Sequence, residues 1–149
     1  MKKIIIISSL FFNFILYAQE NISQLNYAKI EISVPENCVA KSEYEITDCN
    51  GFSAQWLYFN EEMIKQKVNE QFQAQIEEQF VYKKKKNIEF TSQNQKFKGT
   101  KYELKDGTFR IIGFGRINKI PLLLNLGFKK DPNDNKNLTE FEKNFISLK

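Results

Sequence analysis

Apolar and polar residues alternate along much of this chain, which is the pattern of strands with one buried face. The first such segment spans residues 28–34 and ends at Pro35, whose missing N–H suits a strand end. The alternation continues in 43–47, whereas 52–59 is apolar on both faces, as expected of a central strand. We expect these three strands to form a meander, with the Asn-Gly pair at 50–51 in its second turn.

The middle of the chain has the period of a helix instead. Between residues 61 and 82 an apolar residue recurs at every fourth position: Ile64, Val68, Phe72, Ile76 and Phe80. Asn60 precedes this stretch and is a good N-cap residue, because its side chain can accept a backbone N–H. We predict one long helix over 61–82 whose apolar stripe packs on a sheet, so that Phe72→Ala costs about 3 to 5 kcal/mol. The alternative is that the stripe forms a ligand groove.

The second half of the chain returns to the alternating pattern. Residues 87–104 alternate around a turn or bulge at Asn94 or Gly99. Asp106-Gly107 then gives a strong hairpin signal, because both residues tolerate the backbone of a tight turn. This segment therefore predicts paired antiparallel strands.

The two most apolar segments of the chain, 109–117 and 120–128, follow this turn. We predict that both are strands; the alternative for 121–126 is a helix, because its leucines also fit a period of 3.6. Near the C-terminus, Thr139 and Glu142 have the spacing of a capping box, which predicts a short amphipathic helix.

Together these elements predict an α+β fold. We expect an antiparallel sheet of about six to seven strands, with one long helix and a short C-terminal helix packed on it. The order of elements over residues 28–148 resembles the PsbP-like fold, although no binding motif of that family is present. The resemblance implies an accessory or binding role in an extracytoplasmic compartment. A cystatin-like or other α+β sandwich predicts nearly the same pattern.

Residues 1–18 have the composition of a secretory signal peptide. Two lysines precede an apolar stretch at 4–17, which as a helix is about 21 Å long and shorter than the roughly 30 Å hydrocarbon core. We expect cleavage after Ala18 or Gln19, with a retained membrane anchor as the alternative. The mature chain would be one α+β domain over 19–149, periplasmic or secreted in a bacterium, without a transmembrane segment.

The chain has two cysteines, Cys38 and Cys49. An even number of cysteines in an exported chain predicts a disulfide. This bridge would close a loop of about 12 residues, worth about 2.8 kcal/mol in the chain-entropy model. The alternative, a reactive cysteine nucleophile, lacks a histidine to deprotonate it.

Charged residues narrow the set of partners. The chain has 22 Lys and Arg against 18 Asp and Glu, and this net charge of +4 does not indicate nucleic acid binding. Only Arg110 and Arg116 can supply the planar fork that binds phosphate or carboxylate bidentately. A candidate basic surface for an envelope protein or an anionic surface is the run Lys83, Lys84, Lys85 and Lys86. The alternative is a solvated run that satisfies the end of the helix.

The segment 131–142 resembles the calcium loop of an EF-hand. Its candidate ligands, Asp131, Asn133, Asn135 and Glu142, stand at loop positions 1, 3, 5 and 12. However, Lys136 occupies the sixth position, where the loop needs a glycine with positive φ. We therefore expect an ordinary connecting loop, and we predict no cofactor.

The absence of histidine excludes Ser-His-Asp, Cys-His and histidine–metal sites. We therefore expect a non-catalytic binding or accessory protein rather than an enzyme. The alternative is a hydrolase of polysaccharide or cell wall that uses two carboxylates, the hydrolytic device that needs no histidine. Its candidate acids, Glu43, Glu45 and Asp48, are better explained as the polar face of a strand and a turn.

Overall fold

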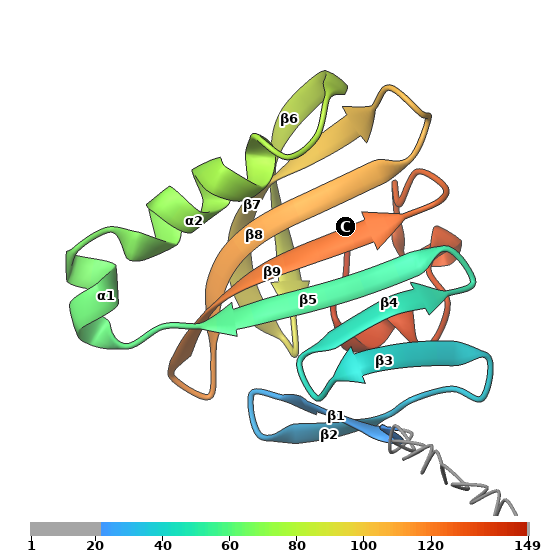
Figure 1. Ribbon diagram of the computed structural model, residues 1–149, viewed down its shortest axis with the longest axis horizontal. Coiled ribbons are helices and arrows are strands. Elements are labelled where there is room, and N and C mark those ends of the chain that lie inside the picture. Colours follow the sequence, from blue (N-terminus) through green and yellow to red (C-terminus); the bar gives the residue numbers. More distant parts are fainter. Residues whose placement is uncertain (1–21, 149) are drawn as a thin grey trace, which may run out of the picture.

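The computed structural model describes residues 22–148, so the predicted signal peptide lies outside the described residues. Strands β3 to β9 form a seven-stranded antiparallel sheet in the order β3-β4-β5-β9-β8-β7-β6, and β1 and β2 form a separate hairpin (Figure 1). The elements are β1 (Gln24–Tyr27), β2 (Ile30–Ser33), β3 (Cys38–Ser42), β4 (Glu45–Cys49), β5 (Phe52–Tyr58), α1 (Glu61–Lys65), α2 (Val68–Glu77), β6 (Tyr82–Ser92), β7 (Gln95–Leu104), β8 (Phe109–Ile117), β9 (Ile120–Phe128), and the 3-10 turns η1 (Asn135–Asn137) and η2 (Glu142–Asn144).

The two most apolar segments of the chain form the strands that were predicted for them. β8 and β9 have the predicted bounds and pair along their whole length, so residues 121–126 are strand and not helix. Asn118 and Lys119, which join the two strands, have φ values of 51° and 67°. Positive φ at both positions of a two-residue turn matches the twist of an antiparallel hairpin.

The first half of the chain contains more strands than predicted. The segment 28–34 was expected as one strand, but Ala28 and Lys29 form the turn between β1 and β2. β1 was not predicted, and its residues Leu25 and Tyr27 are buried. β3 was also missed, because the period of two is too short to recognise in four or five residues. The element order behind the PsbP-like resemblance is therefore different in this half.

The single long helix predicted over 61–82 is wrong. Asn60 caps α1 as expected, with its side-chain oxygen 2.8 Å from the backbone N of Met63. The helix is then interrupted at Lys67, whose φ of 58° is left-handed, and α2 ends at Glu77. From Tyr82 onward the chain is strand β6. Apolar residues spaced four apart also fit a period of two, so spacing alone did not separate the end of the helix from the start of the strand.

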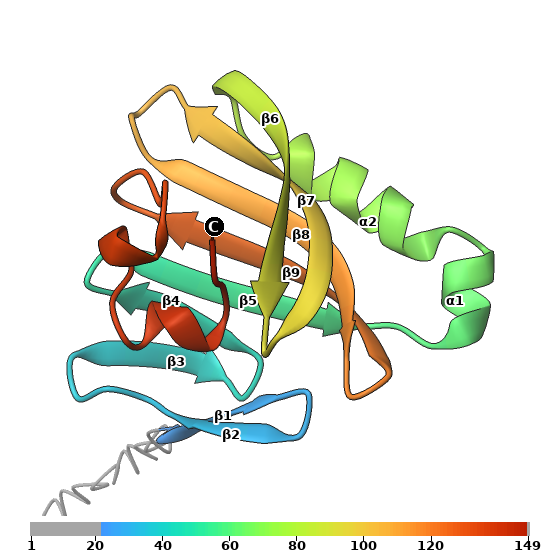
Figure 2. The same ribbon diagram turned by 180° about the vertical axis from the view of Figure 1, so that it is seen from behind.

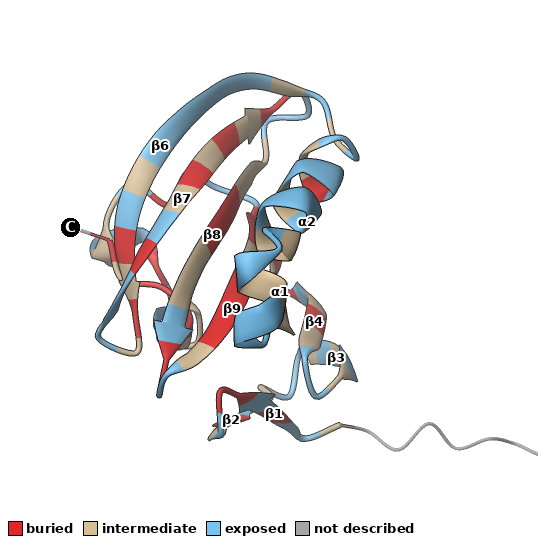
Figure 3. Ribbon diagram, turned by 90° about the vertical axis from the view of Figure 1, so that its left-hand side faces the viewer, coloured by how far each residue is buried: buried red, intermediate tan, exposed pale blue. Residues whose placement is uncertain are grey.

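Because Phe72 is partly exposed, Phe72→Ala is expected to lower the free energy of unfolding less than the sequence predicted. Its side chain is 38% exposed, whereas Ile76, one turn further along α2, is 9% exposed. We therefore expect Phe72→Ala to cost about 1 kcal/mol or less, and Ile76→Ala to cost about 2 to 5 kcal/mol. Urea unfolding of the two variants measures both values. Equal losses would contradict the observed orientation of α2, whose outer surface is mostly exposed in Figure 3.

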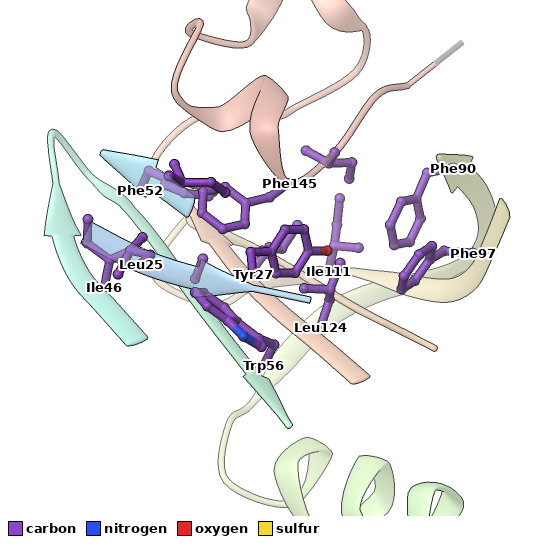
Figure 4. Close-up of a cluster of buried hydrophobic side chains, with 14 of the residues drawn as sticks. Leu25, Tyr27, Ile46, Phe52, Trp56, Phe90, Phe97, Ile111, Leu124 and Phe145 are labelled. Atoms are coloured by element: carbon purple, nitrogen blue, oxygen red, sulfur yellow. The ribbon is translucent and has the colours of Figure 1, made fainter. Parts of the chain in front are cut away.

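The larger core lies on the sheet face opposite α2. The β1–β2 hairpin and the C-terminal segment cover this face, and the C-terminal segment lies in front of the sheet in Figure 2. Tyr27, Trp56 and Phe145 meet there at ring-centroid distances of 5.1 to 5.7 Å (Figure 4). The Tyr27 hydroxyl is satisfied by Ser92 Oγ at 2.7 Å. Aromatic packing therefore closes this face of the sheet. The buried hydroxyl of Tyr27 has a hydrogen-bond partner within it.

Two glycines of β8 make room for the end of the β6–β7 hairpin. A Cβ at Gly113 would lie 2.6 Å from the ring of Phe90, and a Cβ at Gly115 would lie 2.6 Å from the ring of Phe97. The two phenylalanine rings stack on each other with centroids 5.3 Å apart. The hairpin can curl onto the sheet because side chains are missing at these two positions.

The C-terminal helix was predicted and is not formed. Residues 142–144 make only one 3-10 turn, and the chain then becomes extended. The capping box itself is confirmed: Thr139 N donates to Glu142 Oε2 at 2.7 Å, and Glu142 N donates to Thr139 Oγ1 at 3.2 Å. Ser147 instead pairs with Thr91 at the edge of β6, which ends the helical geometry.

Candidate functional site

The lysine run lies in the edge strand β6 and not at the end of a helix. Neighbouring side chains of a strand point to opposite faces, so these lysines do not form one surface. Lys84 lies opposite Glu103, and Lys86 lies opposite Lys101 on the same face. Lys85 points to the other face and contacts Glu77 at 2.8 Å. Lysines along an edge strand are expected where pairing with other chains has to be prevented.

The Lys85–Glu77 contact is part of a small network. Glu77 accepts hydrogen bonds from Lys85 Nζ at 2.8 Å and from the Tyr102 hydroxyl at 2.9 Å. These bonds favour the ionised carboxyl, and they lower the pKa of Glu77 while raising that of Lys85. The network joins α2 to β6 and β7. Within it, the charge of Lys85 is paired with that of Glu77.

The four candidate calcium ligands are held by other partners. Asp131 pairs with Lys101, whose Nζ also lies 3.1 Å from Asn133 Oδ1. Asn135 Oδ1 accepts from the backbone N of Leu148 at 2.7 Å, and Glu142 belongs to the capping box. Within residues 22–148 there is no group of three or more acidic or cysteine side chains with the geometry of a metal site.

We therefore predict that calcium leaves the melting temperature unchanged. The lysine that pairs with Asp131 would have to be displaced before a cation could enter. Thermal unfolding of the chain in millimolar calcium and in chelator tests this. A ligand at a hundredfold excess over its Kd would stabilise the fold by about 2.7 kcal/mol, and a saturable rise that is lost in Asp131→Ala would contradict the prediction.

The candidate acids of a hydrolase lie in β4 and in the turn before it. Glu45 of β4 lies opposite Gln55 of β5, and Asp48 lies opposite Val39 of β3. Within residues 22–148, the carboxyl groups whose pKa is shifted are all shifted downward by hydrogen bonds: Glu61, Glu77 and Asp106. A general acid requires the opposite shift.

A hollow of about 410 Å³ lies between α2 and the β6–β7 hairpin. Glu89 and Lys98 line it and are cross-strand partners, so their charges offset each other. Gln73 of α2 and Asn87 of β6 complete its polar surface. Each of the two charged side chains that line the hollow therefore has its counter-charge opposite it.

The two arginines have different surroundings. Arg116 directs both Nη atoms at the carboxylate of Glu61, with Nη2 3.0 Å from Oε2. Arg110 forms no ion pair with any residue of the described chain. Its Nη1 donates to Asn125 Oδ1 at 2.9 Å, and its guanidinium lies 5.6 Å from the ring centroid of Phe80. Arg110 is therefore a cation that is compensated by neutral groups and an aromatic ring.

Arg110 is also partly buried. Its Nε is inaccessible to solvent and has no hydrogen-bond partner in the described chain. Burial lowers the pKa of Arg110, and the charge of Asp106 offsets only part of this effect. Charges in such positions are costly unless they are paired.

Polar residues from two neighbouring strands surround the guanidinium. Cross-strand pairing aligns Arg110 with Gly127 and Ser53 in one row, and Asn125 with Gln55 in the next. We call Ser53, Gln55, Arg110, Asn125 and Gly127 the Arg110 patch. It lies on the face of the sheet that carries α2. In Figure 1, no element of the described chain lies in front of the first half of β5 or the end of β9.

The Arg110 patch was not predicted from the sequence. Each of its side chains interrupts an otherwise apolar strand: Ser53 and Gln55 in β5, Arg110 in β8 and Asn125 in β9. This signal was present in the sequence. It became interpretable only with the register, which brings residues about 70 positions apart side by side.

No protein-family model, curated protein or solved structure matches this chain. No helix within residues 22–148 is long and apolar enough to span a bilayer. The predicted disulfide is present, between Cys38 and Cys49. It joins directly paired residues of β3 and β4.

Proposed function

We propose that this chain is an exported, non-catalytic binding or accessory protein that holds its ligand on the Arg110 patch. The observation that carries this proposal is a set of polar side chains on the inner strands of an apolar sheet, left uncovered by the helices. Polar groups on such strands cost free energy unless they are satisfied. A ligand would satisfy them.

The scaffold supports a binding role. The patch lies on β5, β8 and β9, which pair along nearly their whole length, and side chains on such strands are held more rigidly than side chains on loops. The disulfide is compatible with an exported protein.

The experiment uses the isotope-labelled chain and extracts of the envelope and culture fluid of its source cells. We expect one extract to shift the amide signals of the patch, without turnover of any extract component. Gln55→Tyr places a ring on the patch and should abolish these shifts. Gln73→Tyr makes the same change at the hollow beside α2 and should leave them intact.

Two outcomes would contradict the proposal. One is that Gln55→Tyr and the unchanged chain respond equally to every extract. The other is that the chain converts an extract component into a product, which would indicate an enzyme. Thermal unfolding of both variants shows beforehand that they are folded.

A further inference from the structure

We propose that the Arg110 patch binds a carboxylate group of its ligand, an inference that rests on the proposed function and adds the chemical class of the ligand. Arg110 is the cation of the site. Ser53, Gln55 and Asn125 are its neutral hydrogen-bonding neighbours.

One side of the Arg110 guanidinium has no hydrogen-bond partner in the described chain. Nη1 is taken by Asn125 Oδ1, whereas Nη2 makes no hydrogen bond within the described chain. Nη2 is also absent from the buried atoms without partners, so it reaches solvent. Arg116 lies on the same strand and the same face as Arg110. Its guanidinium binds the carboxylate of Glu61.

Ser53 Oγ and Arg110 Nη2 both lie near Gly127. A Cβ at Gly127 would lie 3.8 Å from Arg110 Nη2 and 2.5 Å from Ser53 Oγ. The glycine thus leaves the space over this position of β9 in which Ser53 Oγ lies, next to Arg110 Nη2. Ser53 Oγ, Gln55 Nε2 and Asn125 Nδ2 are donors without a hydrogen bond among residues 22–148. The cationic donor and the neutral donors therefore occupy neighbouring positions on one face of the sheet.

The charged groups near the patch favour a single negative charge on the ligand. Arg110 is the one cation among the five residues of the patch, and Lys85, further along the same row, is paired with Glu77. Asp106, whose charge acts on Arg110, already accepts two hydrogen bonds from Thr108. Glu45 lies beside Gln55 and would repel a second negative charge. These surroundings suit a carboxylate better than a phosphate dianion.

The experiment titrates the labelled chain with acetate, acetamide and inorganic phosphate at constant ionic strength. Acetamide has the shape of acetate without its charge. We expect acetate to bind saturably, with a Kd of about 10 mM, and acetamide and phosphate to bind at least about tenfold more weakly. Arg110→Gln should weaken acetate binding at least about tenfold, because a hydrogen bond to a charged group is lost.

Two further variants separate binding from folding. Arg116→Gln removes the other arginine and should leave the Kd for acetate within about twofold. Ser53→Ala removes one neutral donor at an otherwise unchanged strand position and should weaken acetate binding about threefold or more. The Kd values of Arg116→Gln and Ser53→Ala for acetate still test the inference if Arg110→Gln does not fold.

Several results would overturn the inference. These are equal binding of acetate and acetamide, preferential binding of phosphate, no saturable acetate binding, or an equal effect of the Arg110 and Arg116 variants. If acetate fails while an extract still shifts the patch and Gln55→Tyr abolishes that shift, the carboxylate inference fails and the proposed function stands. If the extracts fail as well, both fail.

Discussion

Replacing Phe145 with alanine will destabilise the fold by about 3 to 5 kcal/mol, the range for deleting a buried aromatic ring. Phe145 is fully buried. Its ring centroid lies 5.2 Å from that of Tyr27, 5.7 Å from that of Phe52 and 5.7 Å from that of Trp56. These partners belong to β1 and β5, so Phe145 fixes the hairpin and the C-terminal segment to the sheet. Its loss leaves a cavity bounded by three rings, which belong to the two strands β1 and β5.

Urea unfolding followed by circular dichroism measures this loss. Phe141→Ala is the matched control, because Phe141 lies in the same segment and is only half-buried. We expect a clearly smaller loss for Phe141→Ala. An unfolding midpoint for Phe145→Ala equal to that of the unchanged chain would show that the C-terminal segment does not pack on this core.

Removal of the disulfide will cost about 3 kcal/mol. Cys38 and Cys49 are opposite residues of the β3–β4 hairpin, with Cα atoms 4.3 Å apart. The bridge restricts the unfolded chain, and a loop of about 12 residues corresponds to about 2.8 kcal/mol. It also holds β3, an edge strand whose pairing with β4 is interrupted by register shifts. Without the bridge, this edge should open first.

The double variant Cys38→Ser, Cys49→Ser measures the effect by urea unfolding. Thiol titration of the unfolded, unreduced chain provides the control and should find no free thiol. Two titratable thiols in the purified chain would contradict the bridge. An unchanged free energy of unfolding in the double variant would contradict its contribution to stability.

The strands were predictable where the pattern was long enough. In β8 and β9, nine residues each, the buried positions and the turn at 118–119 specify both bounds. β1 has only four residues and was not recognised. A short strand is determined by its partners, here β2 and the aromatic core, and a local period does not contain that information.

The helices were overestimated for a related reason. Phe80 and Phe145 were assigned to helical stripes, but both occupy their positions because of rings contributed by other elements. Phe80 lies 5.1 Å from Tyr102 of β7, and Phe145 packs on β1 and β5. Aromatic packing of this kind outweighs helix propensity, which is worth less than 1 kcal/mol per residue.

The candidate site was the least predictable part. The sequence drew attention to Lys83–Lys86 and to 131–142, because runs and spacings are visible along a chain. The structure distributes the lysines over two faces of β6 and engages Asp131 with Lys101. Arg110 was identified only as one of two arginines. Arg110 lacks a carboxylate partner because of the residues that the pairing of β5, β8 and β9 places beside it. No local pattern in the sequence contains this pairing.

The central claim is that ligand binds at the Arg110 patch and not at the lysine run. The most direct test is a map of amide shifts over the whole labelled chain during the acetate titration. We predict saturable shifts centred on Ser53, Arg110 and Gly127, with the amides of Lys83–Lys86 unchanged. Shifts centred on the lysines of β6, or a patch that does not respond, would contradict the claim.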